Sequence, residues 1–163
     1  MNSQKKQILN YISLSLIIIS IFISLNPEHT FAQVSENILN NGKLTVIITG
    51  FDNNIGNCRF ALDNSKLIYE RDDTVWIGKV LPIIDQQVIV VIDSLEYGEY
   101  AIRIFHDENE NEKIDTNFLG IPTERYGYSN DASSWFGPPS WEKAKFLFNQ
   151  SDMTIEIKVD SFL

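Results

Sequence analysis

The sequence is poor in cysteine, histidine and basic side chains, and each shortage excludes a class of protein. One Cys among 163 residues allows no internal disulfide and no cysteine-cluster zinc site. With 13 Lys and Arg against 22 Asp and Glu, the formal net charge is -9, so the chain lacks the basic face of a nucleic-acid-binding protein. Only 2 His are present, which leaves few candidates for a general base.

The remaining composition is that of a folded domain. The chain is 44% hydrophobic and 12% aromatic, which is enough to build a core and argues against global disorder. A length of 163 residues excludes a large multidomain enzyme.

The first 32 residues have the pattern of a secretory signal peptide. Lys5 and Lys6 precede a mostly apolar run over 8–25, and Ala32 offers a small residue for cleavage. An uncleaved membrane anchor is the alternative, because the run approaches the roughly 20 residues that span a bilayer. Pro27 favours cleavage, so we expect an exported protein, periplasmic or extracellular, with no stable membrane insertion afterwards.

The chain therefore divides into a signal peptide over 1–32, a polar lead over 33–42 and a single domain over 43–163. Removal of the signal peptide takes away more positive than negative charge and leaves the mature protein more acidic. Such a surface attracts cations and repels anionic partners.

Short segments of alternating polarity recur along the domain, and no long amphipathic helix interrupts them. About seven such segments with turn signals between them predict an all-β fold, a Greek-key β-sandwich of the immunoglobulin-like or transthyretin-like kind. The clearest alternation places Met153, Ile155 and Ile157 on one face. The predicted strands are 43–49, 57–62, 74–80, 86–92, 99–106, 145–148 and 153–159.

Two local features support the sandwich. Gly98 precedes Tyr100 by two residues at the start of a strand, as in a tyrosine corner, where the phenol bonds to backbone a few residues upstream. Cys58 alternates with Phe60 and Leu62 on one strand face, which predicts a small core residue and not a reactive thiol.

The long segment over 107–142 fits no strand pattern, and its start resembles a calcium-binding loop. Asp107, Asn109, Asn111 and Asp115 occupy loop positions one, three, five and nine, where such loops place side-chain oxygens. Lys113 stands at position seven, which contributes a backbone carbonyl. These residues are our candidate ligands for calcium (Ca²⁺).

The loop departs from that pattern at two positions. Glu112 stands at position six, where Gly permits the sharp turn, and Phe118 stands at position twelve, where a Glu would bind through both oxygens. A carboxylate of Glu124 or Asp131, or the amide of Asn117, could complete the set. The alternative is an acidic turn that caps itself through side-chain-to-backbone hydrogen bonds.

Four segments from the end of the fifth predicted strand onward form a distinctive pattern: Phe105-His106-Asp107-Glu108-Asn109, Lys113 to Glu124, Tyr126-Gly127-Tyr128-Ser129-Asn130 and Phe136-Gly137-Pro138-Pro139-Ser140. Across them the chain is similar to the bacterial domain-of-unknown-function 2141 family of exported proteins, and the resemblance extends over about 44–159. Members typically read His-Asp-Glu-Asn-Gly-Asn-Gly-Lys where this chain has Glu110 and Glu112 in place of both glycines. The resemblance implies a secreted or periplasmic β-sandwich with no established reaction.

Aromatic side chains form a second candidate site in the same long segment. Aromatic faces beside amide and acid groups suit stacking on sugars or anchoring of a protein partner. The alternative is a small core that closes one end of the sandwich. The candidate ligand surface comprises His106, Glu124, Tyr126, Tyr128, Asn130, Trp135 and Trp141.

Catalysis has weaker support than binding. His106 adjoins Asp107, but neighbouring strand residues point to opposite faces, so the two do not form a dyad by position alone. We expect a calcium-stabilised binding or structural module without catalytic residues. Its extracytoplasmic ligand, protein or carbohydrate, is unknown. The alternative is an extracytoplasmic hydrolase that uses His106 and carboxylates of the loop.

Overall fold

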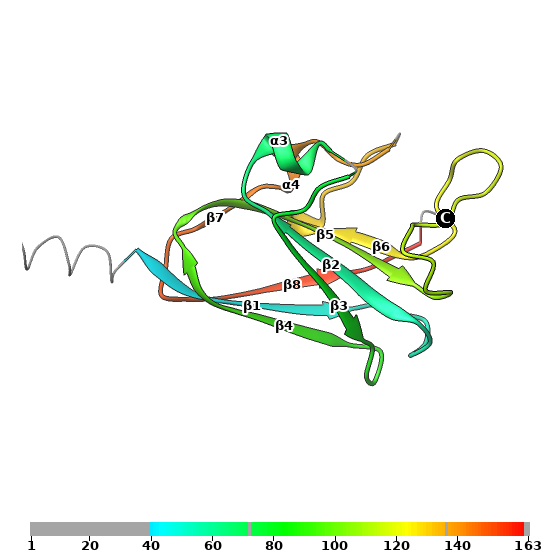
Figure 1. Cartoon of the computed structure of the whole chain (residues 1–163), viewed down its shortest axis with the longest axis horizontal. Helices are drawn as coiled ribbons and strands as arrows, with labels where there is room; N and C mark the ends of the chain where they lie inside the picture. The colour runs from blue at the N-terminus through cyan, green and yellow to red at the C-terminus, as the bar shows by residue number, and fades with distance from the viewer. Residues whose placement is uncertain (1–39, 72, 136, 162–163) are drawn as a thin grey trace, which may run out of the picture. The chain divides into compact units, whose positions relative to one another are not determined.

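Two β-sheets make up the computed structural model, which describes residues 40–71, 73–135 and 137–161. One sheet has the order β4-β1-β8, and the other has the order β3-β2-β5-β6 with β7 paired to β5 (Figure 1). The strands are β1 (Asn41–Thr49), β2 (Asn57–Asp63), β3 (Ile77–Pro82), β4 (Val88–Glu96), β5 (Gly98–Asp107), β6 (Tyr126–Tyr128), β7 (Phe146–Phe148) and β8 (Asp152–Lys158).

The predicted all-β sandwich is confirmed, with differences at single strands. β3 begins at Ile77 and not at Thr74, because the preceding residues pair with a side chain: the backbone amide of Trp76 donates to Asp63 Oδ1 at 3.3 Å. β6 was not predicted, since its three residues, Tyr126–Tyr128, are too few to show an alternation. No helix among the described residues is long and apolar enough to cross a membrane. The predicted signal peptide and residues 33–39 of the lead lie outside the described residues.

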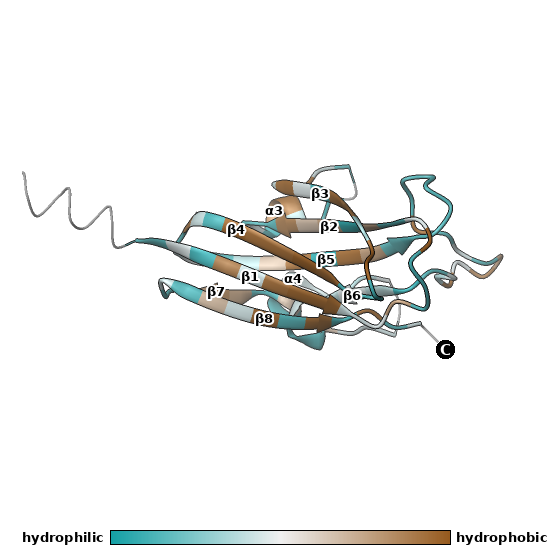
Figure 2. Cartoon of the chain, turned by 90° about the horizontal axis from the view of Figure 1, so that it is seen from below, coloured by the Kyte–Doolittle hydropathy of each residue, from teal (hydrophilic) through white to brown (hydrophobic). Residues whose placement is uncertain are grey.

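The core lies between the sheets and follows the predicted alternation. β1 runs antiparallel to β4 and parallel to β8, while β5 runs antiparallel to β2, β6 and β7. Figure 2 shows the apolar stretches of these strands beside one another. Residues with at most 5% exposure at the centre of this core are Leu44, Val46, Ile48, Cys58, Phe60, Leu62, Val90, Tyr100, Ile102, Ile104 and Ile157.

A smaller cluster covers part of the outer face of the five-stranded sheet. It joins two four-residue helices, α3 (Lys66–Tyr69) and α4 (Trp141–Ala144), through the edge-to-face rings of Tyr69 and Trp141, 5.8 Å apart. Ala101 of β5 lies beneath them, and the Tyr69 hydroxyl donates to the carbonyl of Pro139 at 3.0 Å. Figure 1 shows both helices on one side of this sheet, where they cover only part of its face.

β6 approaches β8 closely at Gly127. A Cβ at this position would lie 3.1 Å from both Ile157 Cγ2 and the carbonyl oxygen of Lys158. Backbone hydrogen bonds between Tyr126 and Asp160, at 3.1 and 2.9 Å, extend the contact. The absence of a side chain at Gly127 therefore lets the two sheets meet along this side.

The predicted tyrosine corner is confirmed. The Tyr100 hydroxyl donates to the carbonyl of Glu96 at 2.8 Å, and the ring is 4% exposed. The bond closes the tight connection between β4 and β5, whose single intervening residue is Tyr97.

We expect Tyr100→Phe to lower the free energy of unfolding by about 1 kcal/mol, because it deletes one buried hydrogen bond and leaves the Glu96 carbonyl without it. Urea unfolding followed by fluorescence measures the change. Tyr97→Phe is the control, since the Tyr97 hydroxyl bonds to none of the described residues, and an equal loss in both variants would contradict this role.

Cys58 is fully buried, and this burial raises the pKa of its thiol to about 12. The thiolate form is therefore scarce at neutral pH, so the core position also makes the thiol unreactive. We expect a thiol reagent such as DTNB at pH 8 to leave the native protein unmodified and to label it fully in guanidinium. Rapid labelling of the native protein would contradict this expectation.

Candidate functional site

The acidic loop, residues 107–115, begins where β5 ends. Asp107 is the last residue of β5 and is fully buried on the outer face of the sheet. Its Oδ2 accepts a hydrogen bond from Arg59 Nε at 2.7 Å and another from the amide of Glu112 at 3.0 Å, while Oδ1 accepts from the amide of Asn111 at 3.0 Å. One carboxylate thus joins β2, β5 and the turn of the loop.

Further side-chain-to-backbone hydrogen bonds curl the loop. Asn109 Oδ1 accepts from the amide of Asn111 at 3.1 Å, and Asn111 Oδ1 accepts from the amide of Lys113 at 2.8 Å. The side-chain amides of Asn109 and Asn111 both donate to Asp115, at 2.6 Å to Oδ2 and 2.9 Å to Oδ1. The structure therefore brings the four predicted side-chain ligands into one hydrogen-bonded group.

Two residues in this loop adopt left-handed backbone. Glu110 has φ 59° and Glu112 has φ 70°, the region that favours glycine. A non-glycine residue there costs on the order of 1 kcal/mol. Asp107 accepts hydrogen bonds from the amides of Asn111 and Glu112, and these bonds offset the strain. The loop therefore forms, without glycine, a turn for which glycine is favoured.

Glu124 braces the loop from below. Its carboxylate is 7% exposed and accepts from the amides of Glu108 at 3.0 Å and Asp115 at 2.9 Å. The other two residues considered as extra ligands lie elsewhere: Asn117 Oδ1 accepts from Leu119 and Ile121, and Asp131 belongs to η1 (Ser129–Asp131).

A metal site in the loop would need amide and backbone oxygens in addition to its carboxylates. Among the described residues, no three His, Cys, Asp or Glu side chains gather in a metal-binding arrangement. The loop offers the carboxylates of Asp107 and Asp115 together with two amide side chains, and oxygens of these kinds suit a hard cation such as Ca²⁺.

His106 lies on the opposite face of β5 from Asp107. Its ring is fully buried, packs edge-to-face on Phe51 at 5.3 Å and places Nε2 2.7 Å from the carbonyl oxygen of Ile55. Nδ1 makes no hydrogen bond with the described residues, and Glu108 Oε1 lies 3.5 Å from it. His106 therefore orients the loop and the preceding turn, and its ring does not reach the surface.

Two arginines lie along the outer face of the five-stranded sheet, each held by a buried carboxylate. Arg59 pairs with Asp107 at 2.7 Å, and Arg103 pairs with Asp63 at 2.8 Å. Arg103 also donates to the carbonyl of Thr74 at 3.0 Å. Both carboxylates are fully buried while both guanidinium groups remain partly exposed, so the face presents cations at its surface.

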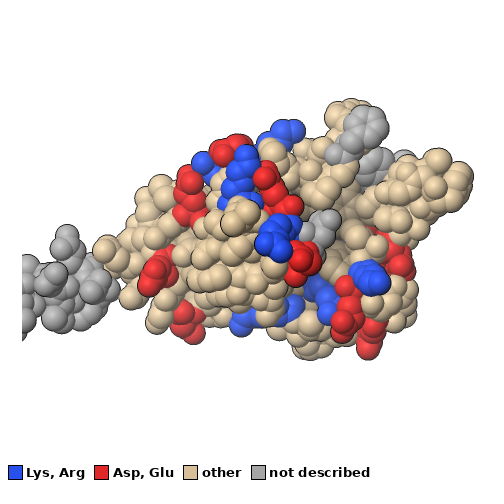
Figure 3. All heavy atoms as spheres, turned by 45° about the horizontal axis from the view of Figure 1, so that its top comes forward, with Lys and Arg blue, Asp and Glu red and all other residues tan. Residues whose placement is uncertain are grey.

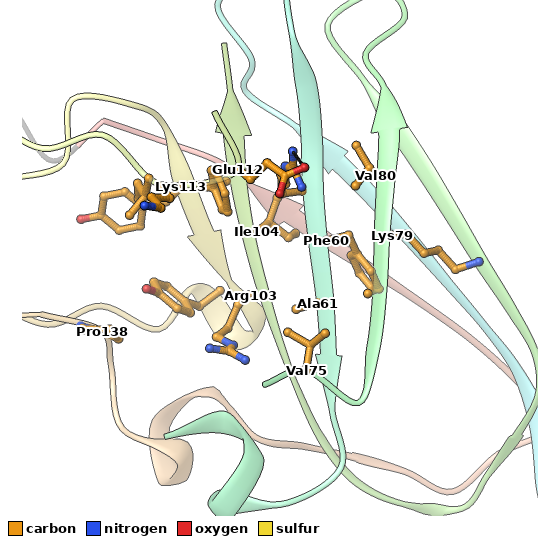
Figure 4. A pocket seen from close by; sticks show the side chains of 16 residues that line it. Phe60, Ala61, Val75, Lys79, Val80, Arg103, Ile104, Glu112, Lys113 and Pro138 are labelled. Atoms are coloured by element: carbon orange, nitrogen blue, oxygen red, sulfur yellow. Dashed lines mark ion pairs between the residues drawn. The ribbon is translucent and has the colours of Figure 1, made fainter. Parts of the chain in front are cut away.

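Small residues leave a hollow between these pairs. Gly78 faces Ala61 across β3 and β2, and Ala61 faces Arg103 across β2 and β5. The result is a groove of about 500 Å³, here called the outer groove. In Figure 4 Glu112 and Lys113 of the acidic loop lie at one end of it, whereas Val75 and Pro138 lie at the other.

The aromatic candidates divide into buried and exposed groups. Trp141 is 5% exposed and belongs to the cluster under α3 and α4, whereas Trp135 is 87% exposed. Tyr126 and Tyr128 are half-buried and meet edge-to-face at 5.9 Å. Burial, together with the nearby carboxylate of Asp160, raises the pKa of the Tyr126 phenol, so it stays protonated at neutral pH.

Asn130 has a structural position. It has φ 60°, and its side-chain amide donates to the carbonyl of Lys145 at 2.7 Å, which ties η1 to the residue after α4. Of the predicted ligand surface, the structure leaves Asn130 and Trp135 exposed and Tyr126 and Tyr128 half-buried. It places His106, Glu124 and Trp141 in the interior.

Sequence patterns pointed to Lys113, Tyr126 and Tyr128 at the rim of the outer groove but missed its floor on β2, β3 and β5. A signal for the floor was present in β2, where Arg59 and Ala61 alternate with the core residues Cys58 and Phe60 and so must face outward. Recognising a groove also required the register of β2 with β3, which the sequence does not reveal.

Glu124→Gln should lower the free energy of unfolding by about 1–3 kcal/mol, because the new amide places a donor against one of two backbone N–H groups. Glu110→Gln removes the same charge from an exposed side chain of the same loop and should change stability by less than about 0.5 kcal/mol. Urea unfolding measures both. Faster hydrogen exchange at the amides of Glu108 and Asp115 in Glu124→Gln alone would show that the lost stability comes from the loop. Equal stability of the two variants would show that Glu124 does not support the loop.

Comparison with known proteins agrees with the sequence resemblance. The model of a family described as uncharacterized protein conserved in bacteria (DUF2141) matches residues 46–156, which is more than half of the chain. No curated protein and no solved structure matches. The matched range contains the acidic loop, the outer groove, Tyr126, Tyr128 and Trp135. The chain belongs to the bacterial DUF2141 family.

Proposed function

We propose that the protein is an exported, non-catalytic binding module in which Ca²⁺ stabilises the acidic loop and thereby one wall of the outer groove. The observation that carries the proposal is the convergence of the Asn109 and Asn111 side chains on Asp115 within hydrogen-bond distance, in a loop whose first residue, Asp107, accepts from the amide of Asn111. The N-terminal signal-peptide pattern supports export.

The loop and the groove are parts of one arrangement. Glu112, Lys113 and Ile114 line the outer groove, and all three lie between the second and the last of the convergent side chains. Glu112 also reaches Arg59 at 3.4 Å, the ion pair drawn in Figure 4. A cation that holds the loop would therefore hold the groove wall, and its binding to the folded state would raise stability by mass action.

Hydrolysis, the second candidate, has less geometric support. A general base must come within about 3 Å of the proton that it removes, and the buried ring of His106 is engaged with Ile55 and Phe51. Asp107 is buried as well and is engaged by Arg59. Among the acids of the loop, Glu108, Glu110 and Glu112 remain exposed, but without a positioned partner base or acid they support binding better than turnover.

A thermal melt tests the calcium proposal. We expect millimolar CaCl₂, compared with EDTA, to raise the melting temperature of the purified protein by several degrees, about 4 °C for each kcal/mol of added stability. Mg²⁺ should do less, because it demands a stricter geometry and gives up its water reluctantly.

Two variants make the melt specific. Asp115→Asn keeps the shape of the side chain but removes the carboxylate on which Asn109 and Asn111 converge, so it should abolish the Ca²⁺ response. Glu110→Gln makes the same charge change on an exposed neighbour and should retain the response. If Ca²⁺ leaves the melting temperature unchanged, or if Asp115→Asn responds fully, the hydrogen bonds alone hold the loop and the calcium proposal is wrong.

A further inference from the structure

Two tyrosines lie at the meeting point of three hollows on the surface. Tyr126 and Tyr128 line the outer groove of about 500 Å³, a second hollow of about 700 Å³ and a third of about 540 Å³. Trp135 lines both the second and the third. Each hollow falls within the size range of small-molecule sites, and because all three share Tyr126 and Tyr128, they adjoin one another.

We propose that these adjoining hollows bind an uncharged oligosaccharide. The inference names the ligand of the binding module proposed above and therefore rests on that function. The rings of Tyr126, Tyr128 and Trp135 supply apolar faces against which the C–H faces of sugar rings can pack. The 87% exposure of Trp135 leaves nearly all of its ring available, as stacking requires.

Side chains that donate hydrogen bonds and side chains that accept them lie beside these rings. Thr116 lines the second hollow, and Ser133, Asp131 and Lys158 line the third. Hydroxyl groups, a carboxylate and an ammonium can donate to and accept from sugar hydroxyls, each of which is both donor and acceptor. Apolar faces with alternating donors and acceptors match the two chemical sides of a pyranose ring.

A peptide added as an extra strand fits this surface less well. Peptide recognition of that type needs the free hydrogen-bonding edge of a strand. At β6 one edge pairs with β5, and on the other the amides of Tyr126 and Asp160 donate to each other's carbonyls, at 3.1 and 2.9 Å. Recognition at Tyr126 must therefore use side chains, which favours a ligand without a repeating backbone amide.

The charges favour an uncharged ligand. Side chains of both signs line the hollows, so neither sign prevails: Glu112 stands with Arg59, Lys79, Arg103 and Lys113 at the outer groove, and Asp131 and Asp160 stand with Lys158 at the third hollow. Figure 3 shows acidic and basic side chains side by side on the visible face, with no basic field to attract a polyanion. Arg59 and Arg103 are already paired with buried carboxylates.

Isothermal titration of the purified protein with four probes tests the inference: hexasaccharides of β-linked glucose, xylose, mannose and N-acetylglucosamine. At least one should bind at millimolar concentration and shift the tryptophan fluorescence, because Trp135 is exposed. Trp135→Ala should weaken that binding about tenfold or more. Trp76→Ala is the matched control, since Trp76 is also exposed but lines none of the three hollows, and it should leave the affinity unchanged.

Hexagalacturonate and an apolar decapeptide serve as competing probes. Tighter binding of either one than of every neutral sugar would overturn the inference, as would absence of sugar binding or full affinity in Trp135→Ala. Thermal melts confirm that each variant is folded. Chromatography of the sugar after incubation separates the two claims: shortened products refute the non-catalytic function but keep the ligand class. An unbound sugar with an intact Ca²⁺ response refutes the ligand class alone.

Discussion

The buried carboxylate of Asp107 is the interaction on which the rest of the surface depends. It accepts hydrogen bonds from Arg59, Asn111 and Glu112, so one group ends β5, starts the acidic loop and places an arginine along the outer groove. A buried charge is tolerated only when it is paired and hydrogen-bonded, and removing one partner costs on the order of 3 kcal/mol. The pair is therefore best understood as fixing geometry, because its net contribution to stability is small beside the cost of breaking it.

The same sheet carries a second ion pair in which the two strands exchange roles. In the first pair β2 supplies Arg59 and β5 supplies Asp107, whereas in the second β5 supplies Arg103 and β2 supplies Asp63. Ala61 of β2 lies between the two pairs. Because each guanidinium is drawn towards its carboxylate, the space above Ala61 stays open. The cluster of Tyr69 and Trp141 fills the corresponding space over Ala101. The outer face is thus half core and half groove, and small residues in β2 and β3 decide which half remains open.

Sequence patterns predicted those features that depend on local chemistry. Alternation located seven of the eight strands, and the spacing of Gly98 and Tyr100 predicted the hydrogen bond to Glu96. The loop over 107–115 forms the hydrogen-bonded turn that its Asp and Asn spacing suggests, with Asn109 and Asn111 donating to Asp115, whereas calcium binding by these residues stays a prediction. Burial of Trp141 agrees with the alternative of a small aromatic core. The outer groove escaped prediction, because it depends on the register between strands and on which loops cover which half of a sheet. Those contacts join residues far apart in the chain.

Glu110 and Glu112 show how charge and backbone conformation compete in this loop. Both have positive φ, where glycine would be free of strain, and both add negative charge beside Asp107 and Asp115. Without a cation, this choice costs twice, once in backbone strain and once in repulsion between carboxylates. A bound cation would reverse the second cost, since each added carboxylate then strengthens the local field that attracts it. Arg59 of β2 already reduces this repulsion in part, because its guanidinium lies 2.7 Å from Asp107 and 3.4 Å from Glu112. Within the protein, Arg59 is thus the positive charge that holds this wall of the groove, and a bound cation would act on the same carboxylates.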